Sequence, residues 1–146
     1  MKKNATNHVD PATPGLGVAL ILLHQQQLLL GRRPKMPMIN SWQLPGGWVA
    51  YHESPQQAVE RLLNKFPEID YDDVQFVCYT DNQFEHGLHS VSLYFQLTCR
   101  NAEAPMVGDN DRGRDWFWAD WYDLPEPLFL PLRLLKQSGF EPTRRL

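Results

Sequence analysis

The sequence lacks the features that would assign the protein to a membrane or to a nucleic-acid polymer. Its longest apolar run, Val18 to Leu23, is far shorter than the ~20 residues that span a bilayer. Lysine and arginine number 14 against 17 aspartates and glutamates, which gives a net charge of −3. Broad electrostatic binding of DNA or RNA needs clustered basic residues. We therefore expect neither a membrane nor a nucleic acid as partner.

Cysteine is also scarce. The two present, Cys78 and Cys99, lie in apolar stretches, so free buried thiols are expected rather than a disulfide. The first residues are basic but lack the apolar segment of a signal peptide. We expect a soluble cytoplasmic protein.

The rest of the chain has the length and patterning of one folded domain. Its 146 residues fit a flexible tail over 1–14 and a single domain over 15–146. Apolar runs at 15–23 and 27–33 flank a polar turn, which predicts a β-hairpin. β-Branched and aromatic residues predict further strands at 74–80, 89–97 and 116–119, and a leucine stripe predicts a helix over 128–138. This mixture predicts an α/β or α+β fold.

A second helix is predicted from its start signal. Ser54 suits the N-cap, Pro55 the first turn and Gln57 the third position of a capping box. The apolar spacing continues to Phe66, and Pro67 should end the helix. We therefore expect a helix from Pro55 to Phe66.

A spaced motif begins just before that helix. Gly47 is followed after five residues by Glu53, and Glu53 after seven by Arg61. LPGG precedes it at 44–47, GRR lies at 31–33, and WFWADWYDLP follows at 116–125. Together these elements resemble the Nudix hydrolase superfamily, and the segment 128–142 resembles its MutT-like nucleotide-triphosphate pyrophosphatases. The resemblance implies a mixed β-sheet sandwiched between helices, a nucleotide or nucleotide-sugar ligand, and a homodimer.

The second half of the Nudix motif departs from the family. Where the resemblance implies three magnesium-binding glutamates, this chain has Leu62, Lys65 and Phe66. On a continuous helix these positions share one face. Leucine and phenylalanine offer no oxygen ligand and lysine repels a cation, so we predict no metal at these positions.

Two motif residues are retained at positions that the family uses in catalysis. Glu53 and Arg61 are expected to pair and fix the loop to the helix; the alternative is that Glu53 still assists chemistry. An unconventional metal site from His52, Glu53, Glu85, His86 and His89 stays open, but their spacing matches no compact metal motif.

Candidate ligand-binding residues follow from the same resemblance. Arg33 matches a phosphate-contacting position, against the simpler interpretation of a solvated arginine. Gly46 and Gly47 permit a tight backbone turn. Lys65 could hold a phosphate in place of the metal, or it could simply be a solvated lysine on the helix surface. The base pocket carries over to Leu44, Trp48, Phe129 and Leu132, and Phe129 could stack on a base or pack in the core.

Three functions remain open at this point. The chain is predicted to be a Nudix-fold binding or interaction module without standard magnesium-dependent pyrophosphatase activity. The alternatives are a hydrolase of a nucleotide or nucleotide sugar with a non-standard ligand set, as GDP-mannose hydrolases of the superfamily also depart from the motif, and a structural subunit of a homodimer.

Overall fold

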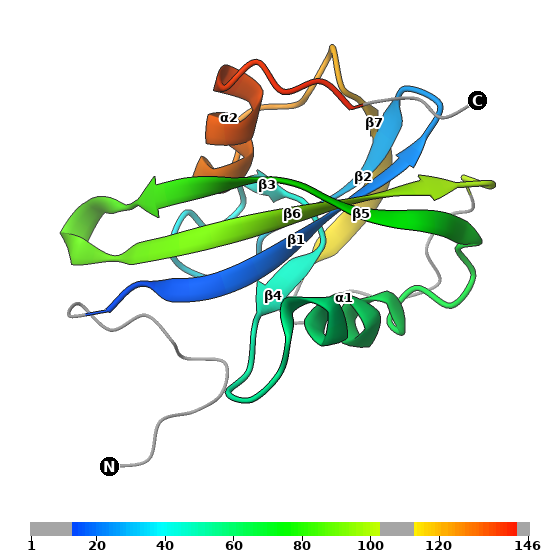
Figure 1. Ribbon diagram of the computed structural model, residues 1–146. Coiled ribbons are helices and arrows are strands. Elements are labelled where there is room, and N and C mark those ends of the chain that lie inside the picture. Colours follow the sequence, from blue (N-terminus) through cyan, green and yellow to red (C-terminus); the bar gives the residue numbers. More distant parts are fainter. Residues whose placement is uncertain (1–12, 103–112, 143–146) are drawn as a thin grey trace.

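The computed structural model describes residues 13–102 and 113–142, so the expected N-terminal tail lies almost entirely outside the described residues. Within those ranges seven strands form one sheet with the order β3-β2-β1-β6-β5, while β4 pairs with β1 and β7 with β2 (Figure 1). The strands are β1 (Gly15–His24), β2 (Gln27–Arg32), β3 (Trp42–Gln43), β4 (Gly46–Trp48), β5 (Tyr71–Gln83), β6 (His89–Cys99) and β7 (Arg114–Asp120).

Two helices cover opposite faces of the sheet. In the view of Figure 1, α1 (Pro55–Leu63) lies below the sheet and α2 (Leu130–Gln137) above it. Each helix has its own buried cluster. Val59 and Leu62 of α1 pack with one, and Leu132 and Leu135 of α2 with the other. This α/β sandwich with a mixed sheet confirms the predicted fold class.

The centre of the sheet is β1, whose nearly continuous hydrophobicity follows from its cover on both faces. Leu20, Ile21 and Leu22 are fully buried, with alternate residues in the two clusters. β1 runs parallel to β6 and turns back into β2 through the pairs Leu23↔Leu28 and His24↔Gln27. The predicted hairpin is therefore confirmed.

The start of α1 is as predicted, but its end is not. The Ser54 side chain accepts from the Gln57 backbone, and the Gln57 side chain accepts from the Ser54 backbone, which completes the capping box. The helix ends at Leu63, three residues before the predicted end. The amide of Phe66 donates to the Leu63 carbonyl at 3.0 Å, a tight turn that replaces α geometry ahead of Pro67.

The edge strand β5 is much longer than predicted. Its pairing with β6 is interrupted by irregularities between Asp72 and Gln75 and between Phe76 and Cys78. Cys78 and Cys99 are free, as expected, but only Cys99 is buried, since Cys78 on the edge strand is half-buried. Burial raises the pKa of the Cys99 thiol to about 12. In the described residues we find no helix long and apolar enough to cross a bilayer.

Candidate functional site

The retained motif residues form an ion pair that ties the loop after β4 to α1. Arg61 Nε donates to Glu53 Oε2 at 2.8 Å, and Nη2 donates to Oε1 at 2.9 Å. The Ala50 amide donates to the same Oε1, and Arg61 Nη2 also reaches the Trp48 carbonyl, both at 2.9 Å. The two predicted catalytic residues are thus brought together as a structural clamp.

This clamp bears on what Glu53 can do chemically. The hydrogen bond from Arg61 lowers the pKa of Glu53 from 4.5 to about 2, helped by the Ala50 amide. Both carboxylate oxygens already accept hydrogen bonds. A carboxylate so stabilised is a weak base at neutral pH. These contacts give Glu53 a structural role, which is to hold the loop after β4 against α1.

The three positions that would carry the metal do not share a face, which corrects the sequence-based expectation. Leu62 and Phe66 are 2% and 6% exposed and pack in the core under the sheet, whereas Lys65 is exposed. The reason is the early end of α1, which places Lys65 and Phe66 in the turn beyond the helix.

Phe66 fills its site as part of an aromatic contact. Its ring meets the Trp116 indole edge to face with the centroids 5.5 Å apart. The indole in turn lies over Gly31, where a Cβ would come within 2.6 Å of it. The absence of a side chain at Gly31 therefore makes room for the Trp116–Phe66 pair.

Magnesium does not fit the residues present at these positions. The buried side chains of Leu62 and Phe66 provide no oxygen, and Mg²⁺ needs hard oxygen ligands. Over the ranges 13–102 and 113–142, no three His, Cys, Asp or Glu side chains gather closely enough to hold a metal. Of the open alternative set, His89 lies 2.5 Å from Asp81 in an exposed pair.

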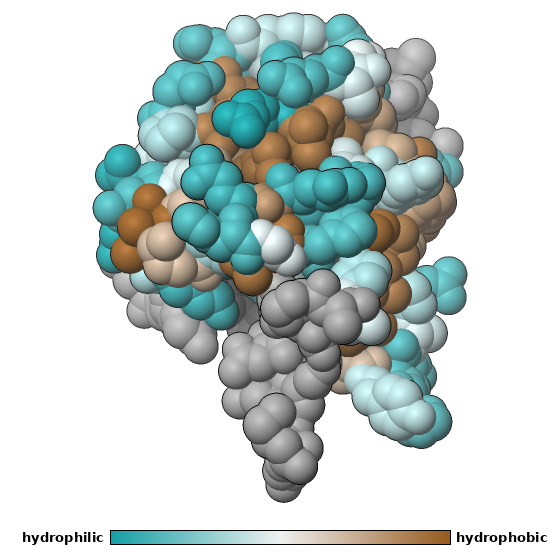
Figure 2. All heavy atoms as spheres, turned by 90° about the vertical axis from the view of Figure 1, so that its left-hand side faces the viewer, coloured by the Kyte–Doolittle hydropathy of each residue, from teal (hydrophilic) through white to brown (hydrophobic). Residues whose placement is uncertain are grey.

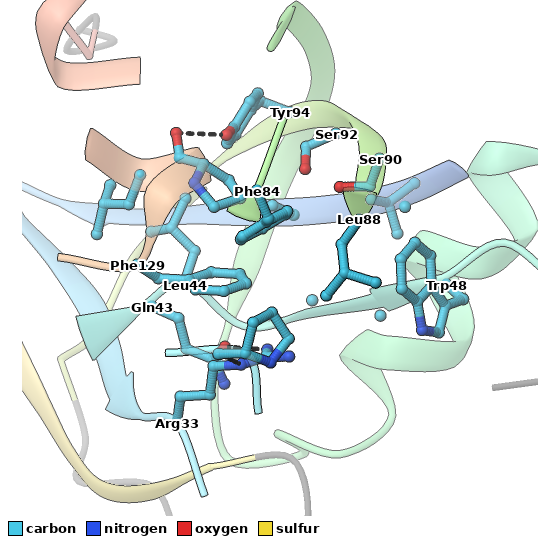
Figure 3. Close-up of a pocket in the computed structure, with 18 of the residues that line it drawn as sticks. Arg33, Gln43, Leu44, Trp48, Phe84, Leu88, Ser90, Ser92, Tyr94 and Phe129 are labelled. Carbon is cyan, nitrogen blue, oxygen red and sulfur yellow. Dashed lines mark hydrogen bonds between the residues drawn. The ribbon is translucent and has the colours of Figure 1, made fainter. Parts of the chain in front are cut away.

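On the other face of the sheet, next to α2, lies a pocket of about 460 Å³. Figure 3 shows Phe84, Phe129 and Leu44 on one wall and Trp48 on the opposite wall. Its lining includes seven of the eight predicted ligand residues: Arg33, Leu44, Gly46, Gly47, Trp48, Phe129 and Leu132. Lys65, the eighth, is not among them. Figure 2 views the molecule from the left-hand side of Figure 1 and shows apolar surface framed by hydrophilic side chains.

Arg33 is one of the charged residues that line this pocket. Its guanidinium lies 4.2 Å over the Phe129 ring and donates to three neutral oxygens: the Pro37 carbonyl at 2.6 Å, the Gln43 amide at 3.0 Å and the Met36 carbonyl at 3.1 Å. Burial lowers the pKa of Arg33 to about 10, which still leaves it charged at neutral pH. Among the described residues, the arginine is thus positioned by contacts with neutral oxygens, with no carboxylate paired to it.

One wall of the pocket was missed by the sequence analysis. Phe84 and Leu88 come from the β5–β6 connection, while Ser90, Ser92 and Tyr94 alternate along β6. The available signal was the period-two spacing of three hydroxyl side chains, which places them on one face of a strand. These hydroxyl residues reach the pocket only because β6 pairs in parallel with β1, and the sequence did not specify that pairing.

The hydroxyl wall is held by a buried polar network. Asn82 is fully buried and donates to Ser90 Oγ at 3.1 Å and to Ser92 Oγ at 2.9 Å. Tyr94 Oη donates to the Pro131 carbonyl and lies 2.9 Å from Thr80 Oγ1. Burial raises the pKa of Tyr94, so it stays a neutral hydroxyl. The network fixes polar groups beside the aromatic wall and joins β6 to α2.

The mixed sheet between two helices, with the Gly47–Arg61 loop and helix, defines a Nudix-type domain. The sequence model of the NUDIX domain matches residues 13–138, and the chain belongs to this family of hydrolases.

Known relatives agree with this assignment. An RNA pyrophosphohydrolase from Cellvibrio japonicus is 30% identical over 134 residues, covering 79% of this chain and 76% of that protein. The MutT NUDIX hydrolase from Burkholderia pseudomallei superposes with a TM-score of 0.75 at 26% identity, covering 88% of this chain and 99% of that one. The NUDIX domain of Shewanella oneidensis NrtR, solved with ADP ribose, has a TM-score of 0.69 at 24% identity and covers 90% and 92%.

Proposed function

We propose that this protein binds a nucleotide-type ligand without magnesium-dependent pyrophosphatase activity. The observation that carries the proposal is the contrast at the site: two of the three positions for metal-binding carboxylates, Leu62 and Phe66, lie in the core, while the pocket has aromatic walls and the half-buried Arg33. Without a metal, nothing in this arrangement lowers the pKa of an attacking water. The chain's own groups remain suited to binding.

The pocket supports a nucleotide-type ligand through its size and chemistry. A volume of about 460 Å³ falls in the usual range for small-molecule sites, roughly 300–1,000 Å³. Phe84, Phe129 and Trp48 offer flat surfaces on which a base can stack, and Arg33 offers a cation for a phosphate. The family and the ADP-ribose complex of the NrtR domain are consistent with a ligand of this class.

Two assays on the full chain test this proposal. We expect no turnover of nucleoside triphosphates or nucleotide sugars with Mg²⁺ or Mn²⁺. We expect thermal stabilisation by a nucleotide in the presence of EDTA, because a ligand at 100 times its Kd stabilises by about 2.7 kcal/mol. Absence of a shift across the nucleotide panel would contradict the binding proposal.

The hydrolase alternative makes the opposite prediction for Glu53. If a non-standard site were active, Glu53→Gln would abolish metal-dependent release of phosphate or pyrophosphate. The matched control is Glu60→Gln, because Glu60 is an exposed glutamate of α1, close to Glu53 in the sequence. Release that survives in Glu60→Gln and is lost in Glu53→Gln would overturn the non-catalytic proposal.

The homodimer is a further part of the proposal. Phe76 and Tyr79 on the edge strand β5 are 54% and 64% exposed, which leaves apolar surface that a second copy would cover. Light scattering is expected to give a dimeric mass for the native chain and a monomeric mass for the Phe76→Ser, Tyr79→Ser variant. A native monomer contradicts this part alone.

A further inference from the structure

The pocket has an excess of positive charge although the chain as a whole is acidic. Arg33 and Lys35 line it, and within the described part of the chain neither forms an ion pair. The other two basic side chains on its wall, Arg61 and His89, each contact a carboxylate. None of the described residues that line the pocket is an aspartate or glutamate. Two cationic groups are therefore left for an anionic ligand.

Arg33 has donors to spare for such a ligand. A guanidinium carries five N–H donors. Three are used, by Pro37, Met36 and Gln43, and these contacts hold the group in place over Phe129. One N–H remains on each terminal nitrogen. Two donors on one rigid plane suit the oxygens of a single phosphate.

Lys35 lies on the same stretch of chain, two residues beyond Arg33. Its side chain is exposed, so it retains the freedom to reach a group held at Arg33. Lysine acts as a mobile point charge, whereas arginine provides the fixed fork. The two together supply about two positive charges at one end of the aromatic slot.

We infer that this pocket takes a phosphate group in its metal-free form, held by Arg33 and Lys35, and therefore favours a nucleoside monophosphate over a magnesium-bound polyphosphate. This inference rests on the proposed binding function and adds the ligand's charge class. A phosphate monoester carries about −1.5 to −2 charges at pH 7, which matches the two cations. Lys65 is not involved, because it lies outside the pocket.

Magnesium is expected to oppose binding of polyphosphates here. An ion bound to a polyphosphate would approach Arg33, and like charges at short distance repel. The pocket's described lining offers no carboxylate to offset that repulsion. Arg33 and Lys35 would neutralise the phosphate charge in place of the metal.

Titration calorimetry on the full chain tests the inference. The probes are adenosine, guanosine, cytidine and uridine with their 5′-mono-, di- and triphosphates, each with EDTA and with Mg²⁺. For the base that binds, we expect the monophosphate to bind about tenfold or more tightly than its nucleoside, because charge-assisted hydrogen bonds form. Mg²⁺ should leave the monophosphate unchanged and weaken the di- and triphosphate.

Two variants and a neighbouring control assign the effect. Arg33→Gln should remove the preference for the monophosphate, and Lys35→Gln should reduce it without altering the fold, since Lys35 is exposed. Arg32→Gln is the matched control, because Arg32 lies over Trp42 and does not line the pocket. It should bind as the native chain does.

The outcomes separate this inference from the proposed function. Equal affinity for a nucleoside and its monophosphate, or tighter triphosphate binding with Mg²⁺, overturns the inference and leaves nucleotide binding standing. No binding by any probe overturns both. If Arg33→Gln fails to fold, an unchanged preference in Lys35→Gln contradicts the role of Lys35.

Discussion

The two faces of the sheet differ in how their side chains are used: one is filled by core packing, and the other borders a pocket. On the α1 face, Leu62 and Phe66 fill the region that the family motif assigns to metal ligands and join the core under β1 and β6. On the α2 face, Trp48 and Phe129 border an open pocket that Arg33 also lines. The metal-ligand positions Leu62 and Phe66 and the pocket wall formed by Leu44 and Leu132 belong to different packing layers, so a substitution in one layer need not alter the other.

The largest expected effect is on the free energy of unfolding, when a carboxylate is placed on the α1 face and the contrast between the two faces is broken. Leu62→Glu or Phe66→Glu places a charge in a site that is at least nine-tenths buried and that the described residues line with hydrophobic side chains. Each is expected to reduce the free energy of unfolding by about 3 kcal/mol or more. Urea unfolding followed by circular dichroism measures the loss.

The neighbouring lysine supplies the control. Lys65→Glu adds the same carboxylate at an exposed position and should change stability by no more than about 0.5 kcal/mol. Millimolar Mg²⁺ should not rescue the buried variants. A folded Leu62→Glu, Lys65→Glu, Phe66→Glu variant with tight Mg²⁺ binding would show instead that the α1 face is a latent metal site.

Local signals in the sequence predicted much of this fold. The β1–β2 hairpin and the capping box at Ser54 depend on neighbouring residues alone, and both are confirmed. The end of α1 was placed three residues too late because apolar spacing continued to Phe66 while Pro67 already disturbed the preceding turn. That error also produced the shared face for Leu62, Lys65 and Phe66.

Part of the pocket was predicted from the sequence and part was missed, again because local patterns do not specify contacts between distant segments. Seven predicted ligand residues line it, because the family resemblance located segments near Arg33, Trp48 and Phe129. The wall from β6 depended on a parallel pairing between distant strands, which no local pattern specifies. Nor does the sequence reveal that Arg33 is held by neutral oxygens, since this follows from the loop that surrounds it.

A smaller effect is expected on ligand affinity when the aromatic wall of the pocket is changed, and it would sharpen the comparison of the two faces. Phe129→Ala removes one aromatic wall of the slot, and the stacking of one base on an aromatic ring contributes about 1–3 kcal/mol. We expect nucleoside monophosphate affinity to fall about tenfold. Calorimetry compares this variant with Tyr51→Ala, whose side chain is 87% exposed and outside the pocket. Equal affinity in both variants would contradict stacking on Phe129.

The smallest effect concerns the junction between the two faces, where Arg61 links Glu53 to the Trp48 carbonyl. Glu53→Gln is expected to cost about 1 kcal/mol at pH 7, a value reduced for solvent screening because Arg61 is 39% exposed. The folded pKa of about 2 lies below the ordinary 4.5, so this stability is complete above about pH 4.5 and is lost as pH falls through about 2.

Denaturant unfolding at pH 7 and pH 3 checks that linkage. The difference between the native chain and Glu53→Gln should be smaller at pH 3, whereas Glu60→Gln, at an exposed position on α1, should show little difference at either pH. A cost that does not change with pH would mean that the Glu53 charge is not what joins the loop to α1. Because Arg61 also lines the pocket, loss of this pair should weaken ligand binding only through the position of Trp48, and less than Phe129→Ala does.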